Sequence, residues 1–154
     1  RELVEVIRSR GDDPLDIMLP FREPLDAFRR ATHGARPLET MLSVHITAGM
    51  LDDFYLALSA SYGATGNRVA EILTADDDRQ SLVKIITDAI AADEEWRDLL
   101  SLWGRRLVGD TLLIARGVLR PQTLDAAEEK RVEPVFTDLL AGHARRMAAI
   151  GLDA

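Results

Sequence analysis

The sequence of 154 residues contains no cysteine, so it has no disulfide, no thiolate-bound zinc or iron–sulfur cluster and no cysteine nucleophile. It also lacks an excess of basic residues. The net charge is −7, which means that no overall positive field attracts nucleic acid. No stretch approaches the roughly 18 apolar residues of a membrane span, and no secretory signal opens the chain. We therefore expect a cytoplasmic protein that has no membrane partner.

The composition that remains is that of an ordinary globular protein. Hydrophobic residues make up 47% and charged residues 29% of the chain, which excludes a disordered tail, a collagen-like rod and a low-complexity segment. Residues 1–154 are enough for a single domain. Arg1 is followed at once by a helical pattern, so we expect the leading helix or helices of the domain to be missing from this chain.

Apolar residues recur at helical spacing along most of the chain, and no segment shows the alternation of a strand or a hairpin signal. We expect a proline-rich connection over 12–36 that contains a short helix at 25–31. Helices are expected over 2–10, 37–58, 68–73, 79–92, 95–119 and 124–150. Gly63 and Gly66 should end the second of these, and Pro134 should interrupt the last, with a helix start near 132–133. The pattern predicts an all-α helical bundle.

The helix that begins at Pro37 is apolar nearly all round and should be central, yet it carries Asp52 and Asp53. Carboxylates are almost never buried without a partner. One interpretation is that Asp52 or Asp53 faces the core and binds a metal. The other is that one is solvated and the other pairs with an arginine such as Arg105 or Arg106. Glu39 lies near the start of the same helix.

Two histidines and one acidic run are further polar features of the sequence. His45 lies seven residues before Asp52 on the same face of the helix. It is either a buried histidine of the core or a metal ligand. His143 is expected to be a cation that complements the C-terminal dipole of the last helix. The run 76–78 consists of three aspartates, which could bind a divalent ion but point in different directions on a helix and are expected to cap it. The sequence has no phosphate-binding glycine loop, no His-Glu-x-x-His motif and no Glu-x-x-His motif.

Several segments together resemble the actinobacterial ferritin-like proteins related to the tRNA hydroxylases that act on 2-methylthio-isopentenyl-adenosine. The resemblance extends over nearly the whole chain. The segments that carry it are Pro20-Phe21, Pro24-Leu25-Asp26-Ala27-Phe28, Asp52-Asp53-Phe54-Tyr55, Leu102-Trp103-Gly104-Arg105-Arg106-Leu107-Val108-Gly109-Asp110, His143-Ala144-Arg145-Arg146-Met147 and Ile150-Gly151-Leu152.

This resemblance implies a ferritin-like helical bundle and a di-iron oxidoreductase that uses oxygen to hydroxylate tRNA. In such enzymes carboxylates and two Glu-x-x-His motifs hold the irons. The matching metal ligands here would be Asp53, with Asp52 beside it, and Asp78, which stands where the family has histidine. Ala75 stands where the family has the acid, and the other ligands would precede Arg1. The alternative is a metal-free structural or interaction module, as a homo-oligomer such as a dimer.

Overall fold

The structure, a computed structural model, describes residues 1–60, 62–75, 79–119 and 126–154, and it describes the side chains of 1–60, 62–75, 79–113 and 134–154. Over these residues the chain is helical and has no strand, which confirms the all-α class. The elements are α1 (Glu2–Ser9), α2 (Pro14–Met18), the 3-10 helix η1 (Leu19–Phe21), α3 (Arg22–Thr32), α4 (Pro37–Ser59), α5 (Gly63–Thr74), α6 (Arg79–Ala92), α7 (Glu94–Leu119) and α8 (Ala126–Ala149).

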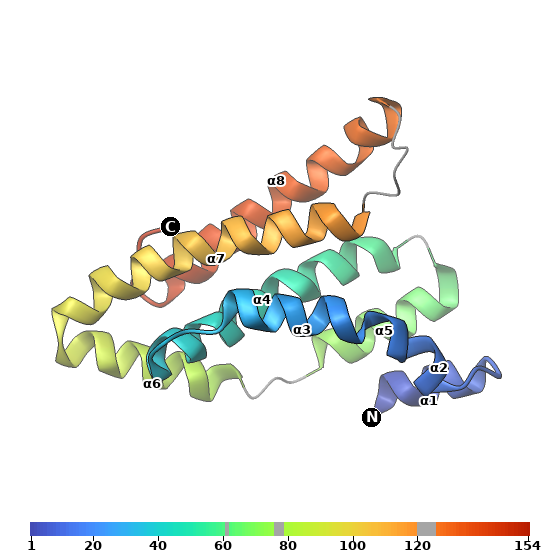
Figure 1. Ribbon diagram of the computed structural model, residues 1–154, viewed down its shortest axis with the longest axis horizontal. Coiled ribbons are helices and arrows are strands. Elements are labelled where there is room, and N and C mark those ends of the chain that lie inside the picture. Colours follow the sequence, from blue (N-terminus) through green and yellow to red (C-terminus); the bar gives the residue numbers. More distant parts are fainter. Residues whose placement is uncertain (61, 76–78, 120–125) are drawn as a thin grey trace.

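Helix α4 forms the centre of the bundle, as its apolar sequence predicts, and packs against α5, α6, α7 and α8. Figure 1 shows α7 and α8 running side by side in opposite directions, with α1 and α2 near the end where α4 leads into α5. The side chains of Leu42, Ile46 and Met50 are almost fully buried. Each such side chain contributes about 1.5–3 kcal/mol on burial, so this stripe anchors the fold.

The connection over 12–36 is largely helical, although its prolines favour an irregular segment. Pro14 begins α2, Pro20 lies in the first positions of η1, and Pro24 lies in the first turn of α3. A proline is tolerated there because the first amides of a helix have no intrahelical acceptor. The short helix expected at 25–31 therefore exists but begins three residues earlier, at Arg22.

Two predicted helix interruptions are wrong. Gly66 lies inside α5 instead of ending α4, and a Cβ there would overlap the carbonyl oxygen of Ser59. Glycine therefore lets α5 fold back closely on the end of α4. Helix α8 also continues through Pro134, which is exposed, instead of starting beside it. A proline inside a helix costs about 3 kcal/mol through the lost backbone hydrogen bond and the clash of its ring, yet α8 stays continuous and packs on α4 and α7.

Trp103 joins α7 to the start of α4 through its indole. Its Nε1–H donates to the carbonyl oxygen of Glu39 at 3.1 Å and to the Oγ of Ser43 at 2.9 Å. Glu39 itself accepts the amide hydrogen of Arg36 with its carboxylate and so caps α4.

Within the described residues, no helix combines the length and apolarity of a membrane span.

Candidate functional site

Asp53 and Arg146 join the central helix α4 to α8. The Oδ2 of Asp53 accepts a hydrogen bond from the Nη2 of Arg146 at 2.7 Å. The same Nη2 donates to the carbonyl oxygen of Gly49 at 2.9 Å. The Asp53 side chain is 35% exposed and that of Arg146 is 22% exposed, so solvent screens the pair only in part. The carboxylate of Asp53, which the sequence identifies as a candidate metal ligand, is therefore already paired with the guanidinium of Arg146.

Two glycines make room for this ion pair. A Cβ at Gly49 on α4 would overlap the Nε of Arg146, and a Cβ at Gly142 on α8 would overlap the Oδ2 of Asp53. Each glycine lies one helical turn before the charged residue of its own helix, so the two side chains meet in the space that the glycines leave. The pair thus occupies a fitted site between α4 and α8.

Asp52 pairs with a different helix. Its Oδ2 lies 2.8 Å from the Nη2 of Arg79, at the start of α6, and both side chains are about three-quarters buried. The alternative that one aspartate is solvated is therefore wrong, because both are paired. Arg105 and Arg106 are not the partners. Arg106 lies 3.4 Å from Asp110 on its own helix, and its guanidinium stacks over the ring of Trp103.

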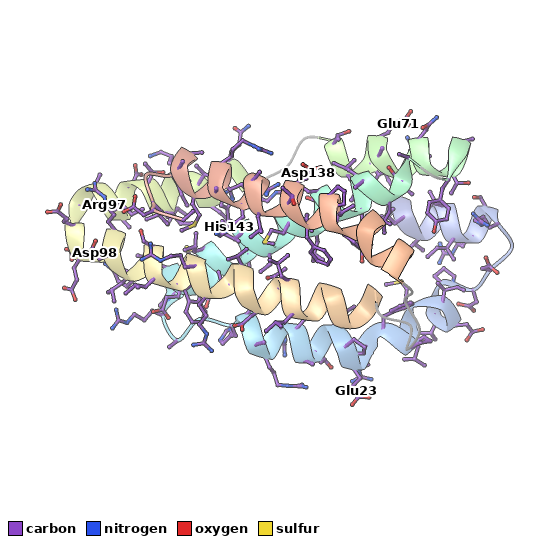
Figure 2. All side chains as sticks on the ribbon, turned by 90° about the horizontal axis from the view of Figure 1, so that it is seen from above. Glu23, Glu71, Arg97, Asp98, Asp138 and His143 are labelled. Carbon is purple, nitrogen blue, oxygen red and sulfur yellow. The ribbon has the colours of Figure 1, made fainter. Side chains whose placement is uncertain are left out.

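Two histidines lie near these arginines. His143 is only 3% exposed, and neither of its ring nitrogens has a hydrogen-bond partner in the described structure; the same holds for the nitrogens of half-buried His45. Figure 2 shows His143 within the bundle, whereas Glu23, Glu71 and Arg97 lie at its edges. Burial and the positive charge of Arg146 lower the pKa of His143. His143 is therefore buried and favours its neutral form, and the expected C-terminal cation is wrong.

The pKa of His45 is lowered for the same reasons, first by burial and then by the charges of Arg146 and Arg79.

A histidine whose pKa is lower in the folded state binds fewer protons there than in the unfolded chain, so stability falls as the pH drops through about 6.5. We expect the melting temperature to fall between pH 7.5 and 5.5. For His143→Gln we expect a smaller loss of stability over the same pH range, because the variant lacks one of the two histidines. At pH 5.5 the loss of unfolding free energy should be smaller than in the wild type by up to about 1.4 kcal/mol. An equal fall in the variant would contradict neutral burial of His143, and His33→Gln, at an exposed position, is the control.

The structure describes two of the three candidate ligands, Asp52 and Asp53, and does not join their carboxylates in one site. Asp52 and Asp53 point to different helices, towards Arg79 and Arg146. Asp78 and the cap expected from the aspartates at 76–78 lie outside the described residues. Among the residues that are described, no group of three or more histidine, aspartate or glutamate side chains could hold a metal ion. The assignment of Asp52, Asp53 and Asp78 as ligands stays a prediction.

A separate apolar cavity of about 360 Å³ lies between α3 on one side and α4, α7 and α8 on the other. Its outer wall includes Phe21, Leu25 and Phe28, and its inner wall includes Met50 and Phe54 of α4. None of the lining residues whose side chains the structure describes is charged. The sequence analysis missed this feature, because its walls come from segments that are far apart along the chain.

The geometry of α4 and its neighbours agrees with a comparison against known families. Residues 1–127 match the family described as the ferritin-like domain of actinomycetes. The chain belongs to this family. The match includes Asp52, Asp53 and Arg79, whereas His143 and Arg146 lie beyond it. None of the curated proteins matches the chain. The ferritin-like bundle is thus established, and its relation to tRNA hydroxylases stays a prediction.

Proposed function

We propose that this ferritin-like chain works without a metal centre, as a structural or interaction module in which arginines neutralise the carboxylates of the central helix. The observation that supports this most directly is the contact of 2.7 Å between Asp53 and Arg146. A second guanidinium, that of Arg79, neutralises Asp52 in the same way. The bundle is then held together by charge pairs between helices and by its apolar core.

The chemistry of the described donor set does not fit a di-iron site. Such sites in ferritin-like bundles use glutamates from two helices and a Glu-x-x-His motif from each of the other two. Here a cation bound to Asp53 would have to displace Arg146, and a cation bound to Asp52 would have to displace Arg79. A guanidinium within ion-pair distance of each carboxylate repels a divalent cation there. We therefore derive no oxygen chemistry for these residues.

The tRNA hydroxylase predicted from the resemblance would need iron ligands that the described residues do not supply. The acidic net charge also gives no support to a tRNA substrate, since phosphate contacts dominate affinity for nucleic acids. A homodimer is the assembly that we propose for the interaction module, and measurement of the molar mass in solution tests it.

Replacing Asp53 with alanine distinguishes an ion pair from a metal ligand. We expect Asp53→Ala to lower the melting temperature, because it leaves Arg146 partly buried without its carboxylate, and to leave the content of bound metal unchanged. Asp88→Ala is the matched control. It removes an exposed pair with Lys84 and should change stability by at most about 0.5 kcal/mol. Loss of bound metal from Asp53→Ala with unchanged helicity would contradict the proposal.

A further inference from the structure

The exposed face of α8 carries few charges. Over 134–149 the inner face of this helix packs on α4 and α7 through buried residues such as Leu139 and Met147. Nine positions of the same segment are exposed, and among them only Asp138 and Arg145 are charged, whereas four are alanines. Figure 1 shows α8 at the edge of the bundle. A helix that borders water normally exposes mainly polar and charged side chains, so this composition indicates a second neighbour for α8.

The small residues of this face have the spacing of a helix-packing seam. Five exposed positions follow one another at alternating steps of three and four residues, and each carries a small side chain. They are Pro134, Thr137, Ala141, Ala144 and Ala148, which we call the α8 seam. Alternating steps of three and four keep a stripe on one side of a helix, where a second helix can pack along it. Small side chains in such a stripe let the two helix axes approach to about 8 Å.

The two charged residues beside the α8 seam show which helix fits it. Neither Asp138 nor Arg145 forms an ion pair or a side-chain hydrogen bond within the residues that the structure describes. They are seven residues apart, so they lie on one side of the helix at a separation of about 10 Å. In a parallel pair of α8 helices each aspartate would face an aspartate. In an antiparallel pair with a twofold axis near Ala141, Asp138 of each copy faces the partner's Arg145, so the charges are self-complementary.

We propose that a second copy of this chain docks on the α8 seam, with the two α8 helices antiparallel and with two identical ion pairs between Asp138 and the partner's Arg145. This inference rests on the proposed function, because it names the surface through which the interaction module forms its homodimer. A seam of small residues buries little apolar area, so the dimer is weak and forms at high protein concentration. The monomer predominates under the dilute conditions of an unfolding experiment, where Arg145 is exposed.

The experiment is sedimentation equilibrium of the full chain at low salt, over protein concentrations up to about 1 mM because an interface this small is weak. We expect the wild type to form a dimer as the concentration rises. Asp138→Arg and Arg145→Asp should each weaken dimerisation by about 10- to 100-fold, since both attractive contacts become repulsive. An equimolar mixture of these two variants should form a dimer again, because opposite charges then face each other at both contacts.

Two further variants test the position of the seam. Ala144→Trp fills the seam without changing a charge and should weaken dimerisation as well. Glu23→Arg is the matched control for the charge changes. Glu23 is an exposed acid that makes no ion pair among the described residues, and it lies on α3, away from Asp138 on α8 (Figure 2). This variant should dimerise as the wild type does, and circular dichroism shows whether each variant is folded.

The outcomes separate this inference from the proposed function. A monomeric wild type, or a mixture of Asp138→Arg and Arg145→Asp that stays monomeric, overturns the docking on the α8 seam. A dimer that persists in folded Ala144→Trp and in both charge variants uses another surface, which overturns the inference but leaves the proposed homodimer in place. The metal-free role is tested by the metal content of Asp53→Ala, which does not depend on dimerisation.

Discussion

Replacing Arg146 with alanine is expected to lower the free energy of unfolding by about 2–3 kcal/mol. The variant leaves the carboxylate of Asp53 without its cation and removes the side-chain donor to the carbonyl oxygen of Gly49. Fully buried pairs lose more when one partner is removed, but here solvent reaches about a third of the Asp53 side chain and screens its charge. Urea unfolding of the purified variant measures the loss.

The neighbouring residue provides the control. Arg145 is exposed, so Arg145→Ala removes the same charge without touching Asp53 and should change stability by at most about 0.5 kcal/mol. A double variant of Asp53→Ala with Arg146→Ala should be more stable than the sum of the single losses predicts, because each single change leaves an unpaired charge. Additive losses would contradict a direct interaction between the two side chains.

Gly142→Ala is expected to lower the free energy of unfolding by about 1–3 kcal/mol, although alanine is the better helix former. The reason is that the added Cβ would overlap the Oδ2 of Asp53 and push the carboxylate away from Arg146. Thermal and urea unfolding, with circular dichroism as the signal, measure the change.

A second glycine within a helix gives the opposite prediction. A Cβ at Gly109 on α7 would meet nothing within 4 Å, so Gly109→Ala should raise the stability by up to about 1 kcal/mol. The two substitutions are chemically identical, and only the surroundings differ. Equal stabilisation by both would show that the space at Gly142 is not needed for the ion pair.

Much of the fold can be predicted because its signals are local. The apolar sequence of α4 predicts its central position, and Pro37 marks its start. The predictions fail where tertiary packing decides. Pro134 does not break α8, and two leucines, Leu113 of α7 and Leu140 of α8, are 69% and 46% exposed although they lie in apolar helices. Periodicity shows which face of a helix is apolar but not how far along the helix a neighbour covers it.

The sequence predicts the carboxylates of the candidate site but not their partners. Two carboxylates inside an apolar helix identify Asp52 and Asp53 from the sequence, because buried charge needs a partner. The partners Arg79 and Arg146 depend on which helices pack together, and Arg105 and Arg106 were equally charged alternatives. One sequence signal was missed. Gly49 precedes Asp53 by one turn, and Gly142 precedes Arg146 by one turn. Each helix therefore has a glycine, which leaves space for a neighbouring side chain, and a charged residue on the same face.

The most direct test of the proposal that this chain works without a metal centre is the iron content of the wild-type protein. The protein is incubated with ferrous iron without oxygen, exposed to air, desalted and analysed for iron per chain and for a ferric-oxo absorption band. The ion pairs of Asp52 and Asp53 predict an iron content near zero and no band. A content of about two irons per chain, as in di-iron bundles, together with the band, would contradict the account.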